Sequence, residues 1–200
     1  YVLPTPGACD RSTHKHVSAF LFDPQAWPMT VIGLDDTDSR ERGMCTTYLA
    51  ARVAEQLAAA GGVVHRRLLV RLNPAVEHKT RGNAALAIHT DLDVEEAFAI
   101  ARQELSELSE TADERTAPGL VVAPIGVDSE GTDAIPPAVV TFTRDAVHEL
   151  HTLTDTLSLL PTLRWRHRGW GAGARPDATV GVAAGPAGRR RIGTLAPHGP

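Results

Sequence analysis

The chain has 200 residues, 42% of them hydrophobic, and a formal net charge of −4 at pH 7. This length allows one large domain or two small ones with a substantial core. The nearly balanced charge excludes a protein that binds nucleic acid or anionic membrane through its overall charge, so local patches must indicate any partner. No apolar run approaches the roughly 20 residues of a membrane-spanning helix, and we expect no membrane partner.

The use of cysteine limits the metal and redox chemistry. Cys9 and Cys45 are the only cysteines, too few for a four-cysteine zinc site or a disulfide framework. His14 and His16 lie near Cys9, but they supply no fourth ligand and no defined spacing. We therefore expect no zinc in this chain and a cytoplasmic, reducing location.

The first 28 residues differ in composition from the rest. They hold four prolines and one compact apolar patch, and Met29 stands directly before the first segment of strand character. We interpret Met29 as the functional start and residues 1–28 as an upstream leader that is poorly ordered or loosely docked.

The first predicted strand covers residues 30–34, and an acidic turn follows it. Three carboxylates, Asp35, Asp36 and Asp38, stand within four positions, and Gly43 precedes a segment of helical character. Acidic side chains and helix N-terminal N–H groups then lie side by side. This arrangement suits a metal-bound phosphate, because Mg²⁺ takes one or two protein carboxylates together with phosphate oxygens.

The acidic turn could also be a simple solvated turn, and the sequence excludes two known motifs. A solvated turn is an open alternative, since Asp is common in turns. An EF-hand is excluded because Arg40 and Thr46 stand where glycine and glutamate are required. A Walker A motif is absent from the sequence, so a nucleotide site here is of another kind.

Further elements are predicted in chain order from hydrophobic periodicity. Helices are expected over residues 44–60 and after Asp93, with Glu96 in capping-box position, and strands over residues 63–72 and 84–90. After Pro118 we expect a strand over 119–125, an acidic loop over 127–137 and a helix over 137–150. The first helix would bury Cys45, Leu49, Val53 and Leu57, the second Phe98, Ala101, Leu105 and Leu108, and the third Val139, Phe142, Ala146 and Leu150.

The alternation of strands and helices predicts an α/β fold of α+β layers. We expect a nucleotide-binding domain over residues 29–118 and a smaller, ferredoxin-like α/β unit over residues 119–171. The Gly-, Ala- and Pro-rich residues 172–200 are interpreted as a loose or incomplete tail.

A polar loop between the second and third strands concentrates positive charge. Arg71, Lys79 and Arg81 lie around a turn in which Gly82 allows close backbone approach, and Lys79 is one of only two lysines in the chain. Such loops are often merely solvated. A lysine point charge beside arginine forks can complement a triphosphate, however, and we interpret the loop as phosphate-binding.

A segment near residue 170 interleaves arginines with tryptophans. This pattern is used to stack on single-stranded RNA bases, with Arg164, Trp165, Arg168 and Trp170 as candidates. Packing of both tryptophans in a core, with the arginines outside, is an equally open alternative.

Four blocks, residues 33–39, 43–48, 71–74 and 79–83, resemble in order and spacing the kinase-like domain of the archaeal agmatinylcytidine synthetases of isoleucine tRNA, the TiaS family. That family phosphorylates C2 of the wobble cytidine of the CAU anticodon with ATP, and agmatine then displaces the phosphate. The resemblance implies ATP and Mg²⁺ as cofactors, with isoleucine tRNA and agmatine as partners.

The resemblance also implies roles for single residues. The three aspartates would hold Mg²⁺ and the ATP phosphates, Lys79 and Arg81 would neutralise phosphate charge, and Thr46 would match the threonine that is phosphorylated in the family. The implied catalytic residues are Asp35, Asp36, Asp38, Thr46 and Lys79. The implied ATP- and phosphate-binding residues are Gly43, Thr46, Thr47, Arg71, Lys79, Arg81, Gly82 and Asn83.

This sequence departs from the family pattern in its second half. Family members are about twice as long and continue into an OB-fold and a zinc ribbon, for which this chain has neither the length nor the cysteines. A glycine-rich family block survives only roughly at residues 190–196. We therefore expect a truncated or frameshifted version that binds ATP and Mg²⁺ and lacks the half that grips tRNA.

Two other functions are compatible with parts of the pattern. A haloacid-dehalogenase-type phosphatase also places D-x-D after a strand, with Asp36 as nucleophile, although Arg40 stands where Thr or Val is expected and residues 43–48 have no role there. A non-catalytic fragment that binds nucleotide or RNA is the third possibility. Turnover of p-nitrophenyl phosphate that Asp36→Asn abolishes would favour the phosphatase, and absence of ATP binding would leave the fragment.

Overall fold

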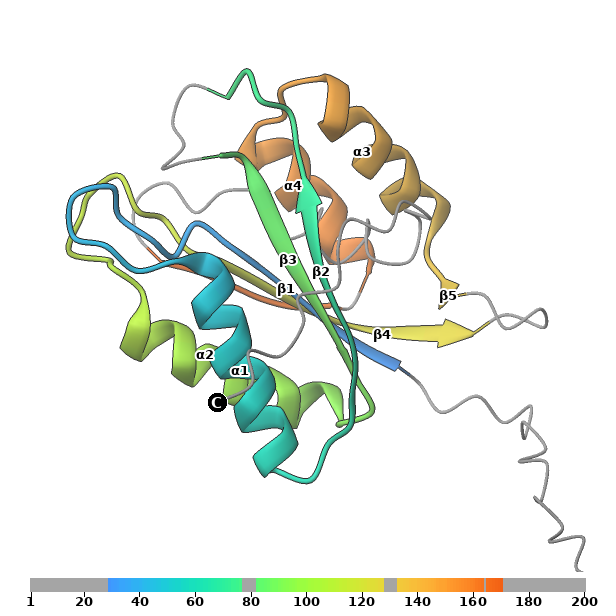
Figure 1. Ribbon diagram of the computed structural model, residues 1–200. Helices are drawn as coiled ribbons and strands as arrows, with labels where there is room; N and C mark the ends of the chain where they lie inside the picture. The colour runs from blue at the N-terminus through green and yellow to red at the C-terminus, as the bar shows by residue number, and fades with distance from the viewer. Residues whose placement is uncertain (1–28, 77–81, 128–132, 164, 171–200) are drawn as a thin grey trace, which may run out of the picture.

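The computed structural model describes residues 29–76, 82–127, 133–163 and 165–170. One antiparallel sheet forms the centre of the molecule, with helices on both of its faces (Figure 1). The sheet strands and helices are, in chain order, β1 Met29–Asp35, α1 Thr46–Ala59, β2 Val64–Arg71, β3 Ala84–Thr90, α2 Val94–Leu108, β4 Gly119–Val127, β5 Asp133–Ala134, α3 Pro137–His148, α4 Leu153–Leu159, the 3₁₀ turn η1 Leu160–Thr162, and β6 Arg166–Gly169. The α/β class predicted from the sequence is confirmed.

Strand β1 lies at the middle of the sheet. The strand order is β2-β3-β1-β4-β5, and β6 pairs with the first half of β4. From Thr30 to Asp35 each residue of β1 is at least nine-tenths buried, which explains its continuous apolar sequence. The acidic turn therefore begins at the end of the most enclosed strand.

Two apolar layers cover the two faces of the sheet. Helices α1 and α2 pack side by side on one face, over a core that includes Ile32, Leu34 and Ile88. The opposite face packs Val31 and Val121 against α3 and the α4–β6 segment, with Val139 from α3. The alternation of residues 31 to 34 between the two layers is the two-residue period of a strand.

The sheet continues across the predicted boundary at residue 118. Strand β4 pairs with β1 over seven residues, from Met29 with Ile125 to Asp35 with Gly119. The strand that was expected to open a second unit is thus the immediate neighbour of β1. The two predicted units share one sheet.

Several local predictions need correction. Helix α3 ends at His148, because Glu149 has an extended backbone, and Leu150 is 63% exposed rather than buried. Asp93 is the N-cap of α2, as predicted, but its carboxylate accepts a hydrogen bond from the N–H of Glu95, at 2.8 Å, rather than from that of Glu96. Helix α4, η1 and β6 were not predicted. The expected leader and tail, residues 1–28 and 172–200, lie outside the described residues.

Candidate functional site

The first two aspartates of the turn are tied to the start of β4. Asp35 Oδ1 accepts a hydrogen bond from the Gly119 N–H at 3.0 Å, and Asp36 Oδ2 accepts one from the Ala117 N–H at 3.0 Å. Asp35 is 1% exposed, so it lies within the protein. Asp36 has a φ of +46°, a conformation that Asp tolerates better than most residues. The chain thus turns sharply as β1 ends.

A chain of hydroxyl groups links the turn to helix α1. The Thr37 hydroxyl donates to Thr46 Oγ1 at 3.1 Å, and the Thr46 hydroxyl donates to Asp38 Oδ1 at 3.2 Å. Thr46 is the first residue of α1, where unpaired N–H groups and the helix dipole favour negative charge. A hydroxyl bonded to a carboxylate at this position is suited to transfer its proton to that carboxylate.

A small hairpin closes the turn. Ser39 and Gly43 exchange backbone hydrogen bonds of 2.8 and 3.1 Å. Gly43 has a φ of +99°, and an added Cβ would meet no atom within 4 Å, so the backbone conformation rather than space requires glycine here. The hairpin brings residue 46 back beside residues 37 and 38.

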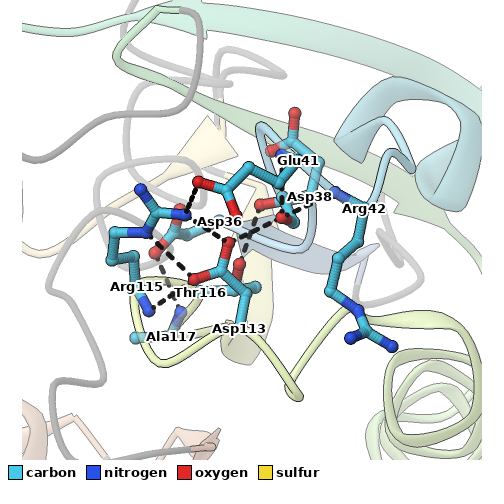
Figure 2. Close-up of polar contacts among 9 residues, drawn as sticks. Asp36, Asp38, Glu41, Arg42, Asp113, Arg115, Thr116 and Ala117 are labelled. Carbon is cyan, nitrogen blue, oxygen red and sulfur yellow. Dashed lines mark hydrogen bonds and ion pairs between the residues drawn. The ribbon is translucent and has the colours of Figure 1, made fainter.

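The loop between α2 and β4 lies against the acidic turn (Figure 2). The Ser39 hydroxyl donates to Asp113 Oδ2 at 2.6 Å, and Arg115 binds both Asp113 and Glu41, at 3.1 and 2.8 Å. The Thr116 hydroxyl donates to the carbonyl oxygen of Asp38 at 3.0 Å. Sequence reasoning missed this loop, and its only signal was a short charged stretch between a helix and a strand.

Two pKa shifts reflect this network. The hydrogen bond from the Arg115 side chain, followed by that from Ser39, holds the pKa of Asp113 well below its usual range. The same pairing, with Glu41 in addition, raises the pKa of Arg115. Asp113 is therefore an ionised carboxylate at any physiological pH.

Cys45 was expected in the buried stripe of α1, but it does not belong to that stripe. It is the N-cap residue of the helix and is partly exposed, with Sγ 2.9 Å from Thr47 Oγ1. Burial raises the pKa of the Cys45 thiol, but hydrogen bonds from Thr47 and Tyr48 outweigh burial and lower the pKa overall. The rest of the predicted stripe, Leu49, Val53 and Leu57, is fully buried.

The base of the predicted cationic loop is well defined. Asn83 donates from Nδ2 to the carbonyl of Asn73 at 2.9 Å, and its own carbonyl accepts from the Leu72 N–H at 3.1 Å. An added Cβ at Gly82 would lie 2.7 Å from Arg71 Nη1, so the guanidinium packs on the glycine backbone. Lys79 and Arg81 lie outside the described residues, and so does Arg164.

The structure separates the two predicted RNA-stacking tryptophans. Trp165 is 7% exposed and packs with Val121 and Leu160, so core packing is the correct description of this residue. Trp170 is partly buried against the core on the α1/α2 face, and the Arg168 guanidinium lies 5.8 Å from its ring centroid. Only Trp170 keeps part of its ring surface exposed.

Comparison with known proteins identifies the domain that carries the acidic turn. Residues 31–92 match the family model of the TiaS TCKD domain. Over these residues the chain resembles that domain. It is 50% identical, over 157 residues, to TiaS of Haloquadratum walsbyi, a 2-agmatinylcytidine synthetase of isoleucine tRNA, and the aligned part is 78% of this chain and 33% of that protein. The chain thus spans about a third of the length of this curated relative.

Solved TiaS structures share the fold. The crystal structure of TiaS in complex with its isoleucine tRNA and ATP matches with a TM-score of 0.67 and 31% identity, covering 78% of this chain and 36% of that chain. The complex of TiaS with the same tRNA, AMPCPP and agmatine matches with a TM-score of 0.65 and 28% identity, with the same coverage. The residues of the TCKD match include Asp36, Asp38 and Thr46, whereas Asp113 and Arg115 lie beyond it.

The carboxylates of the acidic turn fit the expected Mg²⁺ only in part. Within the described residues, no three or more His, Cys, Asp and Glu side chains gather closely enough to hold a metal ion. Asp35 is 1% exposed and is the least accessible of the three aspartates, whereas Asp36 and Asp38 are partly exposed. Asp36 and Asp38 fit the one or two carboxylates that a phosphate-bound Mg²⁺ requires.

In the part of the chain that is described, no helix has the length and apolarity needed to span a membrane.

Proposed function

We propose that this chain binds ATP at the turn between β1 and α1 and uses this ATP in the modification of isoleucine tRNA. The observation that carries the proposal is the contact of Thr46, at the N-terminus of α1, with the Asp38 carboxylate. An N-terminal helix end attracts phosphate, and the neighbouring carboxylates suit a phosphate-bound cation. The synthetase activity for which the TiaS relatives are named, and the ATP in a TiaS complex, support the same ligand.

Thr46 is the proposed acceptor of the γ-phosphoryl group. Its oxygen would attack the γ-phosphorus, its proton would pass to Asp38, and the bond to the β-phosphate oxygen would break with release of ADP. Mg²⁺, when bound with ATP, neutralises phosphate charge and aligns the oxygens. Asp36 and Asp38 are the proposed Mg²⁺ partners. Arg71, Lys79, Arg81, Gly82 and Asn83, with Gly43 and Thr47, are the proposed phosphate-binding residues.

The full reaction that we propose is the synthesis of 2-agmatinylcytidine. In a phosphoryl transfer separate from that to Thr46, ATP phosphorylates the C2 oxygen of the wobble cytidine of the CAU anticodon, and agmatine then attacks C2 and displaces phosphate. The TiaS complex with isoleucine tRNA and agmatine supports these partners. Arg168 and Trp170 are kept as candidate RNA contacts, and the small number of cysteines supports action in the cytoplasm. The relatives favour this function over a phosphatase.

Calorimetric titration of the chain with ATP in the presence of Mg²⁺ tests the proposal. We expect saturable binding that Asp38→Asn weakens at least about tenfold, since hydrogen bonds to charged groups are worth ~1.5–3 kcal/mol. Glu55→Gln, which removes an exposed ion pair on α1, is the matched control and should bind as the parent chain does. Absence of binding by the parent chain would leave only a non-catalytic fragment.

A labelling experiment then separates synthetase from phosphatase. The chain is incubated with γ-labelled ATP and an isoleucine tRNA transcript carrying CAU. Label on protein or RNA that is lost in Asp36→Ala and Asp38→Ala supports the proposed function. Turnover of p-nitrophenyl phosphate that Asp36→Asn abolishes, without transfer of label, would instead support the phosphatase.

A further inference from the structure

We propose that Asp113, together with Ser39 and Arg115, positions the nucleotide-binding turn for its proposed function. The proposal rests on the ATP site described above. It assigns a role to the loop between α2 and β4, which lies outside the TCKD match at residues 31–92. Asp113 is a positioning residue, since it acts through the turn rather than on the nucleotide.

The first observation is that residues 35 to 39 are each joined to this loop or to Gly119, the first residue of β4. The backbone N–H groups of Glu110, Ala117 and Gly119 donate to residues 37, 36 and 35. The Thr116 hydroxyl donates to the carbonyl of residue 38, and Asp113 accepts from the side chain of residue 39. These contacts join residues 73 to 84 positions apart in the sequence, so the loop sets the shape of the turn.

The second observation is that the Asp113 carboxylate is the hub of these contacts. Oδ2 accepts from the Ser39 hydroxyl at 2.6 Å and from Arg115 Nη2 at 3.2 Å, and Oδ1 accepts from the N–H and Nε of Arg115 at 3.0 and 3.1 Å. These four bonds fill the acceptor capacity of a carboxylate. The Asp113 side chain is 9% exposed, whereas that of its partner Arg115 is 61% exposed.

Each bond made by Asp113 constrains one side of the site. On the turn, the Ser39 oxygen also accepts the N–H groups of Glu41 and Arg42, at 3.2 and 3.1 Å, which shapes the hairpin before Thr46. On the loop, the bond to the Arg115 N–H fixes the backbone just before Thr116 and Ala117, whose donors reach residues 38 and 36. Arg115 then crosses back to Glu41 at 2.8 Å. Figure 2 shows Asp113 and Arg115 beside Asp36, Asp38 and Glu41.

An amide cannot replace this carboxylate. In Asp113→Asn one oxygen becomes a donor NH₂ group, which would face the donors of Ser39 or Arg115. The side chain at position 113 then loses two of its four hydrogen bonds with little change in volume. We expect Asp113→Asn to place the Asp36 and Asp38 carboxylates less accurately, and a small misplacement of binding groups is costly for catalysis.

The test uses the full chain and two independent readouts. Amide hydrogen exchange at Ala117 and Thr37 reports the turn itself, because these N–H groups bond Asp36 Oδ2 and Thr46 Oγ1. Calorimetry reports the affinity for ATP with Mg²⁺. The variants are Asp113→Asn, Ser39→Ala and their combination, with Glu55→Gln as a control that removes an exposed ion pair of the same 2.8 Å length as Arg115–Glu41.

We expect Asp113→Asn to accelerate exchange at Ala117 and Thr37 at least about tenfold and to weaken ATP binding by a similar factor. The effect of the double variant should be smaller than the sum of the two single effects, because the two substitutions share the Ser39–Asp113 contact. Glu55→Gln should change neither readout.

Unchanged exchange in Asp113→Asn overturns the positioning role. Faster exchange with unchanged ATP affinity overturns its connection to the nucleotide. If the parent chain binds no ATP, the proposed function fails, while the exchange rates still decide whether Asp113 holds the turn. A general loss of structure is recognised by faster exchange in the central strands β1 and β3, and this outcome also contradicts a local positioning role.

Discussion

Thr46 donates a hydrogen bond to Asp38 across the hairpin that closes the acidic turn, at 3.2 Å. The two residues are eight positions apart, and the contact exists because Ser39 and Gly43 pair their backbones between them. A helix N-terminus, a hydroxyl and a carboxylate are thereby held in one place. Both the proposed chemistry and its dependence on the surrounding core follow from this relationship.

The first prediction concerns the Thr46 hydroxyl. Thr46→Val keeps the shape but removes the donor to Asp38 and the acceptor of the Thr37 hydroxyl. We expect no transfer of γ-label to the protein and a loss of about 1 kcal/mol in the free energy of unfolding, the worth of a typical hydrogen bond. Thr46→Ser should retain labelling. Labelling of Thr46→Val at the parent rate would assign the acceptor to another residue.

Thr156→Val is the matched control for that substitution. Thr156 is 2% exposed, and its Oγ1 is buried with no hydrogen-bond partner among the described residues. Replacing an unsatisfied buried hydroxyl by a methyl group should leave stability unchanged or raise it. Labelling should be unaffected, since α4 lies on the sheet face opposite α1.

The second prediction compares two glycines with the same backbone strain. Gly43 and Gly61 have φ values of +99° and +94°, and neither has an atom within 4 Å of an added Cβ. Alanine at either position should cost ~1 kcal/mol of stability through its left-handed backbone. Only Gly43→Ala should also weaken ATP binding, because only Gly43 shapes the hairpin before Thr46. Equal ATP affinities in the two variants would separate the hairpin from the nucleotide site.

The sequence predicted the parts of the fold that depend on local pattern. The buried run of β1 and the helical stripe of Leu49, Val53 and Leu57 were found because burial on a strand or helix leaves a periodic signal. Asp36, Asp38 and Thr46 were placed near one another because a turn and a helix start are close in sequence.

The rest depends on contacts between distant segments. Asp113 lies 74 positions after Ser39. A loop that is held by single hydrogen bonds has no periodic sequence pattern from which it could be predicted. The pairing of β4 with β1 was missed for the same reason, since a proline before a strand resembles a domain boundary. Trp165 was ambiguous because a tryptophan beside arginines has one local pattern whether it faces the core or the solvent.

The third prediction concerns pH. His89 is 1% exposed, and its Nε2 is buried with no hydrogen-bond partner in the described part of the chain. Burial, followed by the charges of Arg66 and His65, lowers the pKa of His89 from 6.5 to about 4. In the unfolded chain this histidine is protonated below about pH 6.5, whereas in the folded chain it is protonated only below about pH 4. The free energy of unfolding therefore falls as the pH falls from about 6.5 to 4.

The expected size of this effect is about 2 kcal/mol between pH 7 and pH 5, from 1.36 kcal/mol per pKa unit. Urea unfolding at the two pH values measures it. His89→Met should remove most of this pH dependence. His167 is exposed on β6, and His167→Gln should leave the pH dependence as it is in the parent chain. The same pH dependence in His89→Met and in the parent chain would assign the effect to other groups.

The last prediction separates core packing from RNA contact in the segment near residue 170. Trp165 is 7% exposed, and Trp165→Ala should reduce the free energy of unfolding by ~3–5 kcal/mol, as for other buried aromatic residues. Arg168 is exposed on β6, so Arg168→Gln should leave stability within ~0.5 kcal/mol and reduce only binding to an RNA transcript. Thermal unfolding and filter binding of the two variants give the comparison. Parent-level stability of Trp165→Ala would contradict the packing of this ring, and parent-level RNA binding of Arg168→Gln would remove β6 as an RNA contact.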